Sequence, residues 1–507
     1  MLISEVLERD CIVAAPDWNR WLVPPAALSI HLAIGSVYAW SVFKLPLHAA
    51  LGASGVVSAL PFTFAIVMLG LAAALFGTAV ETHGPRWAMT VSASCFCSGL
   101  LISALGAWAS QMWLIVLGYG VFGGIGLGIG YISPVSTLMK WFPDRPGMAT
   151  GFAIMGFGGG ALIASPWSSQ LMSWFGTDHL GLGKTFATMG VAYAVFMMMG
   201  IVLIRVPAAG YGANPVGPDA AKRIRRAAGP DHTAIEAVRT RQFWLLWIVL
   251  CFNVTAGIGI LERAAPIYRD YFPDATSAKA LAAAAAGFVA VLSLANSMGR
   301  LLWSSLSDVF GRKNMYRCYL IVGALMYLAL IEFAGTNKLV FLIATICLLS
   351  FYGAGFATAP AYLRDLFGYY QVGAIHGWLL TAWSTAGVLG PLIINAIADH
   401  QIAAGITGTA RYTLSFSIMI VLLLTAAVCN ELIKLPDVAA QPADAHTDGP
   451  HREHHRQPAP TGVAPVRGSA ASARTLLVGT IGWLWVGVPF AYGLIELLAK
   501  IPALFRS

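Results

Sequence analysis

The chain has 507 residues, of which 58% are hydrophobic and 11% are charged, and its mean hydropathy is +0.72. A soluble domain has about 25% charged residues, so this composition excludes an ordinary soluble protein and indicates an integral membrane protein. The formal net charge of +8 does not indicate a nucleic-acid partner, because no basic stripe with interleaved aromatic residues occurs outside the apolar segments.

Hydropathy predicts an all-α membrane protein with twelve spans and then a thirteenth, because about 20 apolar residues are needed for one helix to cross a bilayer. In chain order the predicted spans are residues 21–43, 57–79, 87–107, 112–138, 148–171, 186–204, 243–265, 282–306, 316–333, 339–363, 372–398, 412–433 and 475–499. The first residues lack a basic segment followed by an apolar core, so we expect no cleaved signal peptide.

These spans divide the chain into two six-helix halves and a tail. The predicted segments are an N-terminal cytoplasmic segment (1–19), an N-terminal half (20–206), a cytoplasmic basic loop (207–241), a C-terminal half (242–435), a disordered linker rich in His and Pro (436–473) and a last transmembrane helix (474–507). Lys and Arg are more frequent in loops on the side of the N-terminus, which predicts that this side is cytoplasmic and that the extreme C-terminus lies outside.

One turn occurs in both halves. The sequence after the second span, GTAVETHGPR (77–86), and the sequence after the eighth span, SSLSDVFGRK (304–313), fit one frame of an acid, a glycine and a base. Such a turn can hold neighbouring helices together through its charges, and paired halves are typical of the major facilitator architecture. The residues of this predicted gating motif are Gly77, Glu81, Gly84, Arg86, Asp308, Gly311 and Arg312.

Arg300 lies inside the eighth span, with no other charge nearby until Asp308. A cation in a membrane-spanning helix costs about 3 kcal/mol or more unless it faces a partner or water. Its long side chain could reach back to the Asp308 end of the helix. Alternatively, Arg300 points into an aqueous cavity and binds an anion, which is the default hypothesis for a charge within the membrane.

Several stretches resemble the major facilitator superfamily and, more narrowly, its oxalate/formate antiporter family. They include GSVYAWSVF in the first span, GIGLGIGYISPVSTLMKWFPDRPGMATG across the fourth and fifth, the Arg300 segment and SFYGAGFATAPAYLRDLFG in the tenth. The resemblance covers residues 18–435 and implies a carboxylate transporter of the bacterial inner membrane. The thirteenth span resembles a small single-span protein that accompanies some of these transporters, so we expect a fused accessory span.

The resemblance also implies a binding site. In the family, an arginine of span eight and a lysine of span eleven bind the carboxylate substrate. The arginine falls on Arg300, but the lysine position falls on Trp383, so the second cation is absent. The resemblance further implies aromatic walls at Tyr38, Tyr131 and Tyr352, with Phe356 one turn beyond Tyr352.

Two histidines lie deep in the spans. His376 precedes Trp383 by two helical turns on one face and could supply a pH-dependent charge, or it could simply bond a backbone carbonyl. His31 is the other deep titratable group. The glycine-rich fourth and fifth spans allow close helix packing, and we expect a moving interface there.

These observations predict secondary transport of a small carboxylate, with a monocarboxylate favoured, by exchange or by proton symport. The expected partners are this anion, a proton and the lipid bilayer. The alternatives are an oxalate/formate-type dicarboxylate exchanger and a carboxylate sensor that does not translocate. No paired acid and base or metal-ligand set stands out, so we expect no enzyme activity, no cofactor and no metal site.

Overall fold

The computed structural model describes residues 7–15, 18–208, 211, 230–273, 278–406, 408–436 and 473–502. The regular secondary structure of this part is helical, apart from one isolated bridge between Val13 and Val206. It contains 13 helices that are long and apolar enough to cross a membrane, which confirms the predicted all-α fold class. In a bilayer, helices satisfy their own backbone hydrogen bonds, and this is why long apolar segments adopt them.

The N-terminal half begins after a short 3-10 helix, η1 (Arg9–Ile12). Its remaining elements are η2 (Arg20–Leu22), α2 (Val23–Ile34), η3 (Gly35–Ala39), α3 (Ser41–Leu51), α4 (Gly55–His83), α5 (Pro85–Trp108), α6 (Met112–Ile115), η4 (Val116–Phe122), α7 (Gly123–Trp141), α8 (Pro146–Phe175) and α9 (His179–Leu203). The first predicted span is therefore interrupted, because the backbone tightens to a 3-10 helix at η3 before α3 begins.

The C-terminal half contains α11 (Ala234–Val238), α12 (Arg241–Glu262), α13 (Ala264–Tyr271), α14 (Ala278–Phe310), α15 (Arg312–Glu332), α16 (Lys338–Phe367), α17 (Val372–Ala403) and α18 (Ala410–Leu432). Helix α11 lies within the predicted basic loop, where a Thr233 capping box starts it. The basic cluster of that loop and nearly all of the predicted linker lie outside the described residues.

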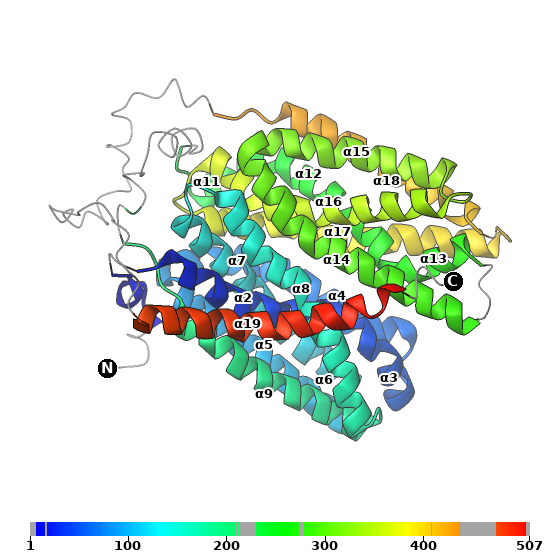
Figure 1. The fold of residues 1–507 in the computed structure, drawn as a ribbon, viewed down its shortest axis with the longest axis horizontal. Helices are drawn as coiled ribbons and strands as arrows, with labels where there is room; N and C mark the ends of the chain where they lie inside the picture. Colours follow the sequence, from blue (N-terminus) through cyan, green and yellow to red (C-terminus); the bar gives the residue numbers. More distant parts are fainter. Residues whose placement is uncertain are drawn as a thin grey trace.

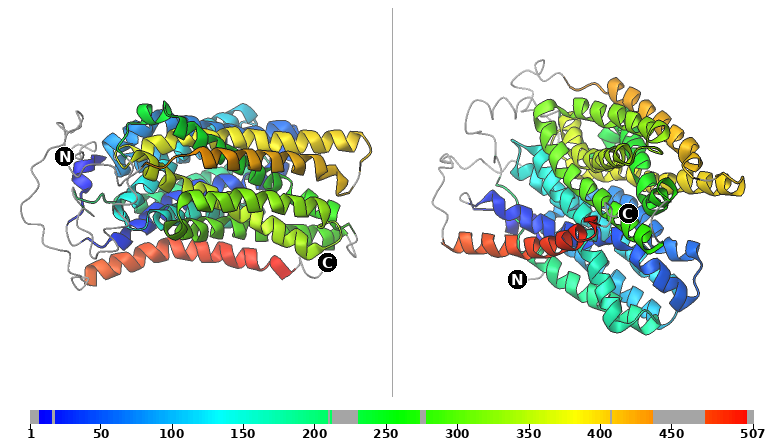
Figure 2. Two further views of the ribbon diagram at one scale, coloured as in Figure 1. Left: turned by 90° about the horizontal axis from the view of Figure 1, so that it is seen from above. Right: turned by 45° about the vertical axis from the view of Figure 1, so that its right-hand side comes forward.

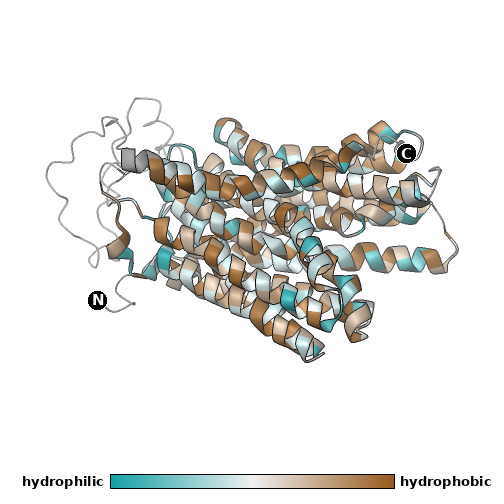
Figure 3. Ribbon diagram, turned by 60° about the horizontal axis from the view of Figure 1, so that its bottom comes forward, coloured by the Kyte–Doolittle hydropathy of each residue, from teal (hydrophilic) through white to brown (hydrophobic). Residues whose placement is uncertain are grey.

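The two halves meet along two helix pairs. Helix α4 packs against α17, and α8 packs against α14, so the second long helix of each half lies on the fifth of the other. Figure 1 shows the halves side by side, with the N-terminus at one end of the bundle, which we call the N-terminal end. The helices are coloured hydrophobic to near neutral over most of their length (Figure 3), as a bilayer requires.

The last helix, α19 (Ala473–Leu498), lies along one side of the bundle, from the N-terminal end to the opposite end (Figures 1 and 2). It packs mainly against α8 and α2. The Trp485 ring stacks on Phe196 of α9 at 5.9 Å between ring centroids. Near its other end, Leu497 joins Leu162 of α8 and Ala290 of α14 in one buried cluster. Helix α19 therefore touches both halves.

The repeated turns have the same backbone conformation. Gly84 has φ 90° between α4 and α5, and Gly311 has φ 85° between α14 and α15. This left-handed region is accessible to glycine and strained for other residues, which explains why both turns carry glycine at this point. The sequence repeat therefore corresponds to a structural repeat.

Candidate substrate-binding site

Arg300 lies at the boundary between the halves and is 1% exposed. Its Nη1 donates a hydrogen bond to the backbone oxygen of Ile154 on α8 at 3.0 Å. Its Nε donates to Asn296 Oδ1, one turn earlier on α14, at 3.3 Å. Among the described residues, Arg300 forms no salt bridge and its Nη2 has no hydrogen-bond partner. The guanidinium therefore keeps a free donor and an uncompensated charge in the centre of the protein.

The alternative in which Arg300 reaches back to Asp308 is wrong. The Asp308 carboxylate instead pairs with Arg312 at 2.6 Å and accepts hydrogen bonds from α8. The guanidinium of Arg300 lies between two aromatic rings, 5.6 Å from the Phe356 centroid and 6.0 Å from the Phe157 centroid. Aromatic faces stabilise a buried cation only partly, by about 2 kcal/mol each. An anion at the free Nη2 would complete the compensation.

The aromatic residues that the sequence singled out come together around this cation. Trp383 lies 4.9 Å from Phe356, 5.9 Å from Tyr131 and 6.3 Å from Tyr38, measured between ring centroids. The hydroxyl of Tyr352 lies 3.4 Å from that of Tyr38. We call this group of five rings with Arg300 the cage. Its walls come from α14, α16 and α17 of one half and from η3 and α7 of the other.

Several polar atoms of the cage lack hydrogen-bond partners within the described part of the chain. These are Tyr131 Oη, Trp383 Nε1 and Arg300 Nη2, together with Nδ1 of the adjacent His376. Buried polar atoms are normally paired, so each such atom calls for an explanation. The phenol, indole and guanidinium atoms are hydrogen-bond donors near neutral pH, whereas the role of the His376 nitrogen depends on its tautomer. Three donors in one place suit a ligand rich in oxygen acceptors.

Two cage contacts were not predicted. Phe157 of α8 packs edge-on against Tyr38, Tyr131 and Trp383, at 5.3, 5.1 and 5.6 Å between centroids. Asn296 orients the Arg300 side chain. A phenylalanine in an apolar span carries no distinguishing signal. Asn296, however, lies one helical turn before Arg300, and its polarity within a span is a signal that could have been used.

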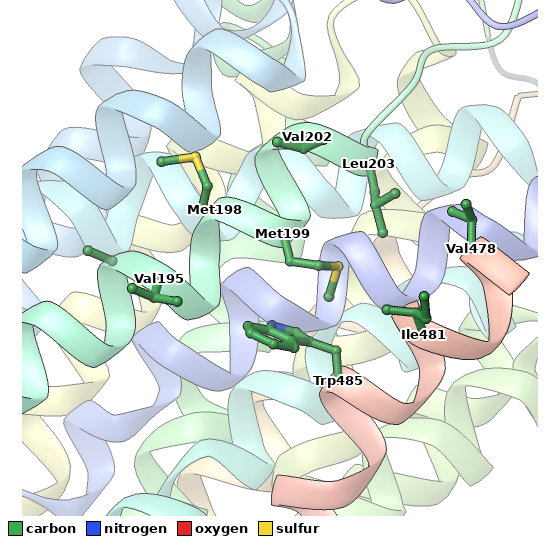
Figure 4. A pocket seen from close by; sticks show the side chains of 9 residues that line it. Val195, Met198, Met199, Val202, Leu203, Val478, Ile481 and Trp485 are labelled. Carbon is green, nitrogen blue, oxygen red and sulfur yellow. The ribbon is translucent and has the colours of Figure 1, made fainter.

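The cage is largely shielded from solvent, and Tyr38 is its one partly exposed member. Arg300, Tyr131, Tyr352, Phe356, His376 and Trp383 are each at most 2% exposed. A cavity of about 580 Å³ lies elsewhere, between α9 and α19, and is lined by apolar side chains such as Met198, Val202 and Ile481 (Figure 4). Its indole, Trp485, donates to the Phe196 backbone oxygen at 3.2 Å. This cavity offers no charged group to an anion.

The predicted gating motif forms two contacts between the halves. Asp308 of α14 accepts hydrogen bonds from the backbone N–H groups of Gly147 and Met148, at 2.9 Å each, at the first turn of α8. In the same way, Glu81 of α4 accepts from Gly373 N at 2.9 Å, at the first turn of α17. Each acid therefore caps a helix of the opposite half, where the helix dipole favours negative charge. We call these the Asp308 cap and the Glu81 cap.

Only one of the two bases in the repeated turns follows the predicted pattern. Arg312 pairs with Asp308 as expected, but Arg86 donates to the Ile201 backbone oxygen at 3.2 Å. Glu81 instead pairs with Lys140 of α7 at 2.6 Å. Gly77 lies at the same interface, since a Cβ there would approach Ala374 of α17 to 2.8 Å.

The glycines of span four contact helices of their own half. Gly124 and Gly128 face α4, and Gly126 faces α5, all within the N-terminal half. In span five, however, a Cβ at Gly158 would lie 3.0 Å from Nε of Arg300. Glycine at this position allows the guanidinium to lie against α8 at the boundary between the halves.

Two six-helix halves that meet around a buried cation define a membrane transporter of the two-half type. The chain belongs to the Major Facilitator Superfamily, whose profile matches residues 26–294 and 272–503. It is therefore a multi-pass membrane protein and a secondary transporter.

Curated relatives are distant. The chain is 28% identical over 356 residues to the uncharacterized MFS-type transporter YhjX of Escherichia coli (strain K12), covering 69% of this chain and 81% of that one. It is 25% identical over 383 residues to the oxalate:formate antiporter of Oxalobacter formigenes, covering 75% and 86%. Apicoplast pyruvate carrier 1 of Toxoplasma gondii is 26% identical over 366 residues, covering 62% and 64%.

Solved structures share the fold. The chain resembles the transporter FucP in its outward conformation with a TM-score of 0.59 and 13% identity, covering 82% of this chain and all of that one. The proton:xylose symporter XylE gives a TM-score of 0.58 and 16% identity, covering 82% and 96%. These likenesses concern the fold alone.

Proposed function

We propose that this protein transports small monocarboxylates by alternating access between its two halves. The observation that carries the proposal is the free Nη2 of Arg300, a buried cationic donor enclosed by aromatic rings. A guanidinium matches a carboxylate with two parallel, charge-assisted hydrogen bonds, and these strengthen where water is excluded. Within the described part of the chain, Tyr131 Oη and Trp383 Nε1 are further donors without a partner in the same cage. The names of two relatives, the oxalate:formate antiporter and the pyruvate carrier, agree with a carboxylate substrate.

The cage favours one negative charge. Trp383 is 0% exposed and lies against Phe356 and Tyr131, at the position where the resembling family carries a lysine. A dianion on Arg300 would direct its second charge toward these rings. An uncompensated buried charge costs several kcal/mol, so a monoanion with a short apolar tail fits better.

The proposed transport cycle uses contacts that join the halves. Arg300 of α14 donates to Ile154 of α8, and the two caps tie α14 to α8 and α4 to α17 at the N-terminal end. A carboxylate bound at Arg300 would give the guanidinium a hydrogen-bond acceptor while its hydrogen bond to the Ile154 backbone oxygen breaks. Opening at the N-terminal end breaks both caps, and opening at the other end leaves them intact. We further propose that the N-terminal end is cytoplasmic and that the membrane is the bacterial inner membrane.

Counterflow in proteoliposomes tests the proposal. Vesicles loaded with unlabelled pyruvate should take up external labelled pyruvate, and formate and lactate should compete. Arg300→Gln should abolish this uptake, and Arg300→Lys should be poor, because a point charge cannot reproduce the two parallel hydrogen bonds. The matched control is Arg317→Gln, since Arg317 is half-exposed and pairs with Glu431 within the C-terminal half. Normal counterflow by Arg300→Gln would exclude an anion site at Arg300.

A dicarboxylate exchanger is the second candidate, and His376 is the observation that favours it. His376 lies 5.8 Å from Tyr131 between ring centroids, with Nδ1 unpaired in the described structure. When protonated, it would add a second positive charge to the cage. Strong inhibition by oxalate at neutral pH would favour this candidate. A sensor would instead bind pyruvate without any counterflow.

A further inference from the structure

His31 on α2 occupies an unusual position. The side chain is 0% exposed. Its Nδ1 lies 2.6 Å from the Ala153 backbone oxygen of α8, and its Nε2 lies 3.1 Å from the Tyr131 backbone oxygen of α7. Both ring nitrogens therefore face hydrogen-bond acceptors, and the acceptors come from two different helices.

A neutral imidazole cannot satisfy this arrangement. It carries one N–H, so one nitrogen would present its lone pair to a carbonyl oxygen, whichever tautomer is present. The imidazolium carries two N–H groups and can donate to both oxygens. The two backbone carbonyls therefore form a site whose geometry fits the protonated ring.

The surroundings of His31 oppose this protonation when the cage is empty. Arg300 of α14 and His376 of α17 are the charged or titratable groups that face it across the cage, together with the phenol of Tyr131. None of these groups is an acid at neutral pH, and within the described part of the chain no carboxylate pairs with His31. Burial of a charged ring without a carboxylate partner disfavours the proton, and repulsion from the Arg300 cation adds to this until a negative charge enters.

The backbone of α8 connects His31 with the proposed substrate site. His31 contacts the oxygen of Ala153, and Arg300 donates to the oxygen of the next residue, Ile154. Phe157 lies against both side chains, 6.4 Å from the His31 centroid and 6.0 Å from the Arg300 guanidinium. An anion bound at Arg300 would therefore reduce the positive potential at His31, and each ligand would favour the other.

We propose that His31 binds the proton that moves together with the substrate anion. This inference rests on the proposed function. In the loaded state, one proton occupies the second ring nitrogen and one monoanion lies on Arg300, so the pair adds no net charge. Departure of the anion restores the repulsion from Arg300 and expels the proton on the same side. The protein would then be a proton symporter for monocarboxylates that still performs exchange.

Uptake driven by a pH gradient, compared with counterflow at equal pH, tests this role. A proton coupled one to one with a monoanion accumulates pyruvate about tenfold across a gradient of about one pH unit. We expect His31→Gln to lose this accumulation, down to the level of protein-free vesicles, while counterflow persists. The control is His83→Gln, because His83 is exposed at the end of α4 and contacts Thr82 and Ala79. This variant should retain both activities.

The outcomes separate the two proposals. Absence of counterflow in the wild type would refute the proposed function itself. Counterflow without any gradient-driven accumulation would refute only the role of His31, and so would full accumulation by His31→Gln.

A second measurement remains decisive if His31→Gln fails to fold. When pyruvate is added in a weakly buffered detergent solution, the wild-type protein should take up about one proton per bound anion. A pH indicator measures this uptake. Binding of pyruvate without proton uptake between pH 6 and pH 8 would overturn the proposal.

Discussion

Asp308→Asn should open the N-terminal end of the transporter. In the wild type, both carboxylate oxygens of Asp308 accept backbone N–H groups from the first turn of α8, which belongs to the opposite half. Asparagine retains the shape but has one acceptor oxygen and no charge, so one of the two hydrogen bonds and the interaction with the helix dipole are lost. Arg312 keeps a second partner, Asp365, at 3.4 Å, and this limits damage to the fold.

The expected magnitude follows from these contacts. A carboxylate at a partly buried helix N-terminus contributes up to about 2 kcal/mol, and one ordinary hydrogen bond contributes about 1 kcal/mol. A loss of about 2 to 3 kcal/mol changes the ratio of open to closed molecules by about 30- to 150-fold. Because the cap joins two halves, most of this loss should appear in the opening equilibrium rather than in unfolding.

Cysteine labelling measures the opening. Thr150 of α8 is 0% exposed, and its hydroxyl donates to the Ala357 backbone oxygen of the opposite half at 2.6 Å. In a background without native cysteines, Thr150→Cys should react with a maleimide about 30-fold faster or more when Asp308→Asn is added. The control is Glu431→Gln, which breaks ion pairs with Arg317 and Lys313 inside one half. Labelling of both variants within about twofold of the parent would refute the reasoning.

Three further predictions concern the other cap, the cage and the topology. Glu81→Gln should accelerate maleimide labelling of Thr150→Cys less than Asp308→Asn does, because Glu81 accepts one backbone N–H instead of two. An equal or larger acceleration by Glu81→Gln would contradict this ranking of the two caps. Trp383→Lys should make oxalate a competitor of pyruvate uptake that is about tenfold or more stronger, because a charge-assisted hydrogen bond contributes about 1.5 to 3 kcal/mol. If the variant still transports pyruvate but oxalate competes no better, the absence of a second cation at position 383 does not explain the preference for monocarboxylates. A tag after Ser507 should be accessible from outside intact cells, and a tag within residues 436–473 should not; cytoplasmic readout at both sites would mean that α19 is re-entrant or peripheral and does not cross the membrane.

Much of the arrangement was predictable because the informative residues are chemically out of place. An arginine inside a span, tyrosines in glycine-rich helices and a tryptophan at a lysine position all stand out from an apolar background. The structure places Arg300, Tyr38, Tyr131, Tyr352 and Trp383 around one centre. The thirteen spans followed from hydropathy, which depends only on local composition.

The contacts that depend on packing between distant helices were not predictable. Phe157 looks like any apolar residue of a span, and only the fold brings it against the cage rings of Tyr38, Tyr131 and Trp383. The partner of Glu81 is Lys140, 59 positions away, while the nearer Arg86 faces α9. The carbonyl pair around His31 is invisible in the sequence, since backbone atoms are the same at every residue.

The last helix has a consequence for assembly. A separate single-span subunit reaches its transporter by diffusion in the membrane, so the occupied fraction depends on how much of each chain the cell makes. Here residues 433–472 join α18 to α19 in one polypeptide. A covalent tether of this length holds α19 near its packing surface on α8 and α2 at an effective concentration of about millimolar, whatever the expression level. Every copy of the transporter then carries one copy of α19, and modest packing such as the cluster of Leu497, Leu162 and Ala290 is enough to keep this helix in place.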